Sequence, residues 1–165
     1  MKILQMPKIV SNTTPIISLL KLNRLDLLQQ LYNEIYIPLA VYKEIEAGKA
    51  KVYYTDLSKF DWIKIVEIKD KKAVKYFLDL DQGEAEAIVL ATECNADLII
   101  LDERLGRFYA KHAELKVTGT IGVLIKAKME GLINEVRPLL EELIKKEVWI
   151  SEKLKREILQ KIGEE

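Results

Sequence analysis

The stretch Asp97-Leu98-Ile99-Ile100-Leu101-Asp102 decides the fold of this chain. Its four central residues are all apolar, they do not alternate with polar residues, and the run has the length of a β-strand. A strand that is apolar on both sides must be covered on both sides, which is typical of parallel sheets enclosed between two layers of helices. The stretch therefore predicts an α/β fold.

The segments on both sides of this run alternate between strand and helix signals. We expect further strands at 8–11, 34–37, 62–66 and 115–117. We expect helices from Pro15 toward Tyr32, from Pro38 to Gly48, from about Lys71, from Asp81 through Glu93, and over 103–113, 120–130, 134–146 and 151–162. This order predicts a three-layer α/β/α architecture with a central parallel sheet, in which ligands bind beyond the carboxyl ends of the strands.

The length of 165 residues fits a single domain of ordinary size. We expect this domain to occupy residues 1–150 and to be followed by a C-terminal helix within 151–165. Four apolar residues form a stripe on that helix: Leu154, Ile158, Leu159 and Ile162. A stripe of this kind must be covered, either by the domain itself or by a second copy of the chain.

The composition excludes several classes of protein. Lys plus Arg and Asp plus Glu each number 26, so the formal net charge is zero and no basic field covers the whole surface. A single Cys and a single His cannot form an internal disulfide or a Cys/His zinc site, so any metal would be held by oxygen atoms. No run approaches the roughly 18 apolar residues of a membrane helix, and we expect a cytoplasmic protein.

Polar side chains follow three of the expected strands. Asn12 follows the first, Asp102 follows the apolar run, and Thr118 and Thr120 follow the next strand. Asp102 could instead cap the helix that begins after it. Thr14 stands directly before Pro15 and can cap the first helix, so Asn12 needs another role, such as a turn hydrogen bond or a ligand.

Two glutamates on expected helices have structural interpretations when each is taken alone. Asp81 and Glu84 have the spacing of a capping box, in which the third carboxylate folds back on the cap residue. Glu86 lies about 200° further around the same helix, so it cannot face the same site as Glu84. Glu44 is an ordinary residue of a helix surface.

Taken together, these residues resemble the PIN-domain family. Four blocks appear in the family's order, namely IVSNTTPII (9–17), IPLAVYKE (37–44), DQGEAEAI (81–88) and LDERLGR (101–107). The stretch VTGTIGVL (117–124) also resembles a prokaryotic branch of the family that is catalogued as of unknown function. The resemblance implies a metal-dependent ribonuclease, often the toxin of a toxin–antitoxin pair, and often a homodimer.

The resemblance also implies the site. Asn12, Glu44, Glu84 and Asp102 would bind Mg²⁺ or Mn²⁺, and Glu44, Glu84 and Asp102 would be the catalytic residues. Clustered carboxylates repel one another unless a cation lies between them, and hard oxygen ligands suit Mg²⁺. Most active PIN nucleases have Asp where this chain has Asn12, so the site carries one negative charge fewer.

A basic stripe follows the Asp102 position. Arg104, Arg107 and Lys111 recur at helical spacing and are candidates for binding substrate phosphates, together with Thr13 and Thr118. A solvent-exposed face is the alternative for the stripe. His112 lies beside it, but no Ser or Cys is paired with it by any recognisable motif, so we interpret it as structural.

Three functions are compatible with these patterns. The first is a PIN-type ribonuclease that uses Mg²⁺ or Mn²⁺, with RNA as substrate and an antitoxin protein as partner. The second is a PIN-fold module that binds nucleic acid or protein without cleavage. The third, a phosphatase with Asp102 as nucleophile, would need an acid two residues later, where the chain has Arg104.

Overall fold

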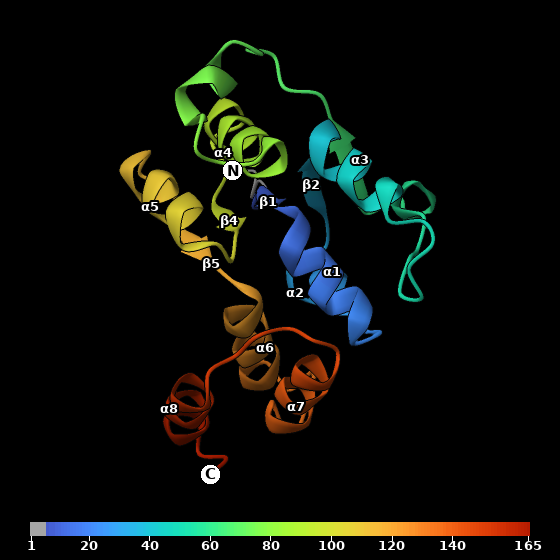
Figure 1. Cartoon of the computed structure of the whole chain (residues 1–165), viewed down its shortest axis with the longest axis vertical. Coiled ribbons are helices and arrows are strands. Elements are labelled where there is room, and N and C mark those ends of the chain that lie inside the picture. Colours follow the sequence, from blue (N-terminus) through green and yellow to red (C-terminus); the bar gives the residue numbers. More distant parts are fainter. Residues whose placement is uncertain (1–5) are drawn as a thin grey trace, which may run out of the picture.

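A computed structural model describes residues 6–165 and shows a five-stranded, all-parallel sheet flanked by helices (Figure 1). The strands are β1 (Ile9–Ser11), β2 (Ile35–Pro38), β3 (Ile63–Val66), β4 (Leu98–Ile100) and β5 (Val117–Thr118), in the spatial order β3-β2-β1-β4-β5. The helices are α1 (Thr13–Lys21), α2 (Asp26–Tyr32), α3 (Leu39–Ala47), α4 (Gln82–Glu93), α5 (Arg104–His112), α6 (Thr120–Met129), α7 (Arg137–Lys145) and α8 (Glu152–Ile162). The predicted α/β fold with a central parallel sheet is confirmed.

The apolar run at β4 is covered on both sides, as its composition predicts. Ile100 belongs to a hydrophobic cluster that includes residues of α1, α2, α6 and α7. Ile99 and Leu101 belong to a second cluster that includes residues of α4 and α5. All three side chains are fully buried. The central strand β1 divides its residues in the same way, with Ile9 in the first cluster and Val10 in the second.

The expected single helix from Pro15 to Tyr32 is wrong, because the chain turns between α1 and α2. Asn23 has a φ of 55°, in the left-handed region that Asn tolerates better than most residues. Its N–H donates to the Leu20 carbonyl at 2.9 Å, and the Arg24 N–H donates to the Leu19 carbonyl at 2.9 Å. This pattern ends α1 in the way that left-handed residues commonly end helices.

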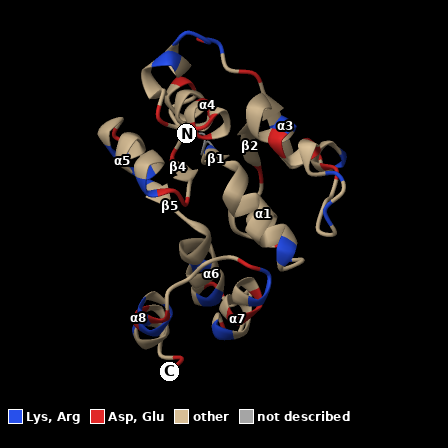
Figure 2. Ribbon diagram, in the orientation of Figure 1, with Lys and Arg blue, Asp and Glu red and all other residues tan. Residues whose placement is uncertain are grey.

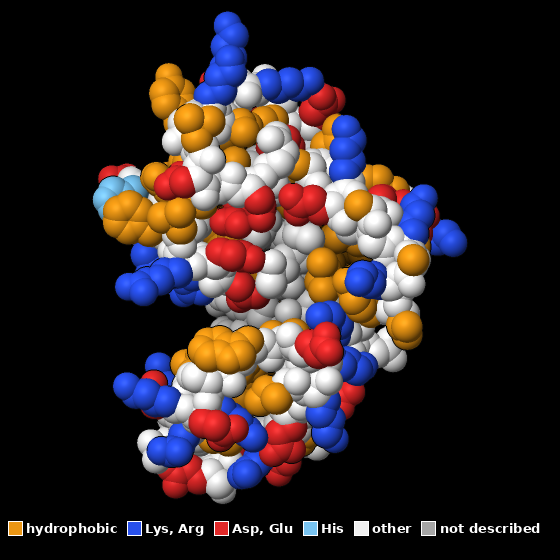
Figure 3. Space-filling view, viewed as in Figure 1, with side chains coloured by type: hydrophobic (Ala, Val, Ile, Leu, Met, Phe, Trp, Pro, Cys, Tyr) orange, Lys and Arg blue, Asp and Glu red, His pale blue; other side chains and the backbone are white. Residues whose placement is uncertain are grey.

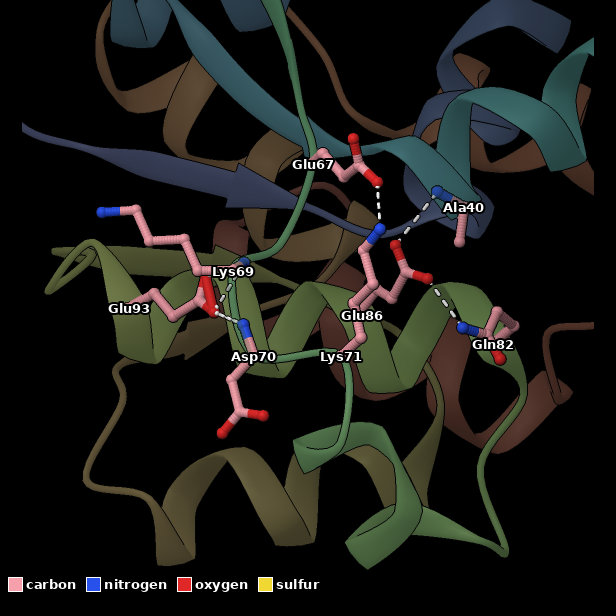
Figure 4. A network of polar contacts seen from close by, with 8 residues as sticks. All are labelled: Ala40, Glu67, Lys69, Asp70, Lys71, Gln82, Glu86 and Glu93. Carbon is pink, nitrogen blue, oxygen red and sulfur yellow. Dashed lines mark hydrogen bonds and ion pairs between the residues drawn. The ribbon is translucent and has the colours of Figure 1, made fainter.

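The helix expected from Lys71 is also wrong, since the segment forms only a short 3₁₀ turn over Ala73–Phe77. None of the side chains in this turn is buried, so no apolar face favours a longer helix. Lys69 and Asp70, just before this turn, are bound to α4. Glu93 accepts hydrogen bonds from the N–H groups of Lys69 and Asp70, and Glu86 accepts one from Ala40 (Figure 4). A second 3₁₀ turn spans Leu57–Lys59.

The C-terminal helix α8 contacts the rest of the chain through its apolar stripe. Ile158 and Leu159 are buried in the first cluster, whereas Leu154 is 41% exposed. Glu164 follows the helix and accepts hydrogen bonds from Lys128 Nζ, at 2.8 Å, and from the N–H groups of Val136 and Arg137. Burial raises the pKa of Glu164, but these bonds outweigh burial and hold the pKa below its usual value. Within residues 6–165, no helix is long and apolar enough to cross a membrane.

Candidate functional site

Asn12 lies at the end of the central strand and is almost completely buried, with 1% of its surface exposed. Its N–H donates to the Ile100 carbonyl at 2.9 Å, which extends the pairing of β1 with β4 by one residue. Its side-chain Nδ2 donates to Glu103 Oε2 at 3.2 Å. Its Oδ1 is buried and has no hydrogen-bond partner among the described residues. A buried oxygen of this kind is available to a ligand.

The sequence suggested Thr14 as the cap of the first helix, and this suggestion is wrong. Helix α1 begins at Thr13, and Asn12 holds the cap position without a side-chain cap bond. Thr14 Oγ1 instead donates to Glu103 Oε1 at 2.5 Å. Glu103 therefore contacts the side chains of both Asn12 and Thr14, and it joins the start of α1 to the start of α5.

Glu44 extends from α3 toward the first turn of α4. Its Oε1 accepts a hydrogen bond from the Gly83 N–H at 3.0 Å, and its Oε2 accepts one from Thr13 Oγ1. Burial raises the pKa of Glu44 above its usual value, and the nearby charges of Asp81 and Glu103 add to this effect. The hydrogen bonds from Thr13 and Gly83 oppose the increase. Thr13, expected as a substrate contact, here positions Glu44.

Glu84 is the most perturbed acid of the site. It lies in the first turn of α4 with 6% of its surface exposed, and its N–H donates to Asp81 Oδ1 at 2.8 Å. Burial, a hydrogen bond to Asp81 and the charges of Asp81, Glu103 and Glu44 raise the pKa of Glu84 to about 8. Asp81 therefore caps α4, and Glu84 remains an acid that holds its proton unless a positive charge is close.

Asp102 has a different set of partners from the other acids. Its Oδ1 accepts a hydrogen bond from the Thr120 N–H at 2.7 Å, and its Oδ2 accepts one from Thr120 Oγ1 at 2.6 Å. The cap residue of α5 is Glu103, so the alternative in which Asp102 caps the next helix is wrong. Asp102 instead joins the end of β4 to the start of α6.

Each of three acids lies against a glycine of another element. A Cβ atom on Gly83 would lie 2.5 Å from Glu44 Oε2, and one on Gly119 would lie 2.6 Å from Asp102 Oδ1. A Cβ on Gly106 would lie 2.9 Å from Glu84 Oε2. Carbon–oxygen contacts this short do not occur in folded proteins. The glycines therefore allow the carboxylates to lie directly on the backbone of neighbouring helices.

A groove opens beside Asp102. Its cavity measures about 680 Å³ and is formed by residues of α5, of the β5–α6 segment and of α8. It is lined by the expected substrate contacts Arg104, Arg107, Lys111 and Thr118, together with Asp102. Phe108, which is 54% exposed, and Leu154 add apolar surface to the groove. One Arg107 Nη atom donates to the Leu101 carbonyl at 3.2 Å, so part of this side chain serves the fold.

Charged side chains are unevenly distributed over this face of the molecule (Figure 3). Acidic side chains gather near the middle of the face, between α5 and α3, next to a hollow above the α6–α8 part of the chain (Figure 3). The basic residues near the start of α5 lie beside the acidic residues Asp102 and Glu103, which connect β4 to α5 (Figure 2). A ligand that is cationic in one part and anionic in another would complement both the acidic and the basic side chains.

The chemistry of the donors suits a hard divalent cation. Within residues 6–165, no three His, Cys, Asp or Glu side chains are already arranged to hold a metal ion. Nevertheless, the buried Asn12 Oδ1 has no partner among the described residues, and the carboxylate of Glu103 is close enough to those of Glu44 and Glu84 to help raise their pKa values. All of these donors are oxygen atoms, which Mg²⁺ and Mn²⁺ prefer. The residues therefore fit such an ion.

The structure relates the sequence-derived residues in two groups. The first group surrounds four acids that we call the acidic cluster, namely Glu44, Asp81, Glu84 and Glu103. Asn12 and Thr13 contact this cluster through Glu103 and Glu44. The second group lines the groove and consists of Asp102, Thr118 and the basic residues of α5.

Glu103 and Asp81 belong to the acidic cluster, although the sequence did not assign Glu103 to the site and indicated Asp81 only as a helix cap. Glu103 could have been found as a second acid directly after Asp102, but the sequence indicated it only as the first residue of the helix expected over 103–113.

Comparison with known proteins identifies the family of the chain. A search of curated proteins finds no match to the chain. The sequence profile described as DUF3368: PIN domain matches residues 8–164, so it covers the sheet, both sets of site residues and α8. The chain therefore belongs to the DUF3368 PIN-domain family.

Proposed function

We propose that the protein is a nuclease of PIN type that cleaves RNA with the help of Mg²⁺ or Mn²⁺. The observation that carries this proposal is the buried, unpartnered Oδ1 of Asn12, whose amide contacts Glu103, together with the closeness of Glu103 to Glu44 and Glu84, whose pKa values its charge helps to raise. A buried polar atom without a partner and partly buried like charges both cost folding free energy unless a counter-charge is present. A divalent cation would offset the repulsion between the carboxylates and would give Asn12 Oδ1 a partner.

In this proposal Asn12, Glu44, Glu84 and Asp102 hold the cation, and the three acids are the catalytic residues. When bound, the cation supplies Lewis acidity, which neutralises charge on the phosphodiester and makes water easier to deprotonate. The chain's own task is to hold the ligands in place. Thr13 and the Gly83 N–H orient Glu44, while Thr120 orients Asp102.

The groove provides the proposed binding site for the substrate. Arg104 and Lys111 are exposed and can bind phosphate oxygens, and Arg107 points into the same cavity. Thr118 lines this cavity and Thr13 lies beside Glu44, so both hydroxyl groups are near the proposed path of the strand. Phosphate contacts of this kind position a nucleic acid without reading its sequence.

The test is cleavage of a mixed-sequence single-stranded RNA by the purified protein with added Mn²⁺. We expect cleavage by the wild-type protein and its loss in Glu84→Gln and Asp102→Asn. Glu86→Gln is the matched control, because Glu86 lies on the same helix but accepts hydrogen bonds from Ala40 and Gln82 (Figure 4). Cleavage that persists in Glu84→Gln, or that needs no divalent cation, would contradict the proposal.

A second function, binding without cleavage, is supported by Asn12 itself. An amide oxygen at this position attracts a cation less strongly than a carboxylate does. The same experiment separates the two functions. RNA that is retained by the protein but stays intact with Mn²⁺ and with Mg²⁺ would favour the binding module.

We further propose that the protein is the toxin of a toxin–antitoxin pair, on the strength of its family. Expression in a bacterial host should then arrest growth, and Glu84→Gln should remove the arrest. Growth that is unaffected by the wild-type protein at the same expression level would argue against a toxin. An antitoxin protein and a second copy of the chain are the proposed partners.

A further inference from the structure

The contact between Asn12 and Glu103 fixes the orientation of the Asn12 amide. A carboxylate can only accept hydrogen bonds, so the atom of Asn12 that lies 3.2 Å from Glu103 Oε2 must be the nitrogen. Oδ1 then points away from Glu103 and remains without a partner. Thr14 Oγ1 holds the other carboxylate oxygen of Glu103, so the glutamate cannot turn away without breaking two bonds.

We propose that Glu103 supplies to the cation site the negative charge that position 12 lacks, so that Asn12 and Glu103 together replace one aspartate. Asn12 offers the ligand oxygen, and Glu103 both aims that oxygen and adds the charge. The inference rests on the proposed metal-dependent function. It concerns the position at which this chain has Asn12 where most active PIN nucleases have Asp.

The charge of Glu103 acts inside the cluster and not only on Asn12. It is among the charges that raise the pKa values of Glu44 and of Glu84, which come from two other helices. Glu103 is half-buried at the start of α5, where the screening of charge by water is weaker than at an exposed surface. A negative charge in this place therefore attracts a cation bound among the same residues.

A purely structural role for Glu103 is the competing explanation. In that case Glu103 would only join the start of α1 to the start of α5 through Asn12 and Thr14. Its replacement by Gln would then leave cation affinity nearly unchanged, since Gln Oε1 can still accept one of the two bonds. The two explanations differ in their dependence on charge.

The experiment measures Mn²⁺ affinity by titration calorimetry on the full chain, together with the melting temperature without metal. We expect Glu103→Gln to weaken Mn²⁺ binding by about tenfold or more, as is common when a charged group that supports a metal site is removed. The double variant Asn12→Asp/Glu103→Gln returns the charge to position 12, and its affinity should be within about threefold of the wild type.

The controls keep the outcomes separate. Glu135→Gln, an exposed glutamate between α6 and α7, should bind Mn²⁺ as the wild type does. If Glu103→Gln binds within about twofold of the wild type, or the double variant binds no better than Glu103→Gln, the shared-charge inference is overturned and the metal site stands. A wild-type protein that binds no Mn²⁺ overturns the proposed function, and this inference with it. The melting temperatures identify any variant that does not fold.

Discussion

The carboxylates of the candidate site are placed by glycines of neighbouring elements as well as by the elements that carry them. Gly83 leaves room for the Glu44 carboxylate, and Gly106 and Gly119 do the same for Glu84 and Asp102. Side chains that lie on backbone have few alternative positions, which favours a pre-organised site. None of these glycines has a positive φ, so close approach and not backbone conformation explains them.

We therefore predict that Gly83→Ala weakens Mn²⁺ binding by about threefold or more, because the new methyl group occupies the position of the Glu44 carboxylate. Titration calorimetry measures this directly. Gly48→Ala is the control, since its added Cβ would meet its nearest neighbours at 3.4 and 3.6 Å, near ordinary contact distance. Equal affinity in Gly83→Ala and Gly48→Ala would show that Glu44 does not bind the ion.

The single variant Asn12→Asp should raise the affinity for Mn²⁺ but lower the melting temperature of the metal-free protein. It adds an anionic ligand, so we expect tighter binding of Mn²⁺ in calorimetry. Without metal, two carboxylates would lie where Asn12 Nδ2 and Glu103 Oε2 are now 3.2 Å apart, so the melting temperature should fall. Equal or weaker Mn²⁺ affinity in the variant would mean that position 12 is not a ligand.

Helix α5 combines structural positions and positions that line the groove on one short element. Gly106 and Ala110 are buried against the core, whereas Arg104 and Lys111 are exposed along the groove. Arg107 is divided between the two roles because it donates to the Leu101 carbonyl. The exposed basic residues are therefore the ones whose removal tests substrate binding without damage to the fold.

We predict that Arg104→Ala/Lys111→Ala weakens RNA binding and lowers its dependence on salt, by about one unit of the log–log slope for each phosphate that is no longer neutralised. Affinity measured by fluorescence anisotropy across a series of salt concentrations gives the slope. Lys153→Ala, an exposed lysine of α8, is the matched control. An unchanged slope would assign the stripe to a solvent-exposed face.

Helix α8 contributes to the hydrophobic core, and this bears on the two ways in which its stripe could be covered. Ile158 and Leu159 are buried by their own chain, and Glu164 then binds the start of α7. A chain that ends at Ile150 should thus melt at a lower temperature and less cooperatively than the wild type, because the truncation uncovers part of the core. Calorimetry and light scattering on both proteins check this. An unchanged melting temperature with a changed mass would instead assign the helix to a dimer contact.

The sequence predicted the elements whose patterns are local and strong. The apolar run at β4 indicated burial on both sides, and Asp81 indicated the start of α4, because each signal lies within a few neighbouring residues. The break between α1 and α2 was missed because one Asn in the left-handed region ends the helix within an apolar pattern that continues. The partners of Asp102 and Glu103 could not be predicted, since both acids bond to residues distant in sequence.

The stability of the protein should depend on pH through the acidic cluster. The pKa of Glu84 is raised to about 8 in the folded chain, so the folded state binds this proton more tightly than the unfolded state does. The resulting stabilisation is complete below the usual pKa of Glu84 and is lost as the pH rises toward 8. Without metal, we therefore expect the melting temperature to fall over this range.

Thermal melts from about pH 5 to about pH 8.5, with and without Mn²⁺, measure this effect. Added Mn²⁺ should raise the melting temperature most at the high end of the range, where Glu84 gives up its proton most easily. Glu84→Gln should flatten the curve recorded without metal. A wild-type melting temperature that is constant, or that rises with pH without metal, would contradict the assignment of Glu84 as a buried acid.

The place of β1 in the sheet has a consequence for how the chain is made. This strand is the earliest of the five in the sequence, yet it lies at the centre, and its partner β4 follows much later, with Ile9 paired to Leu98. Pairing between such distant residues is slow, because a long loop must close first. Asn12 and Glu103 can meet only after this closure. A nascent chain that has emerged only as far as α4 thus carries Glu44 and Glu84 but neither β4 nor Glu103, so the candidate site cannot yet be assembled.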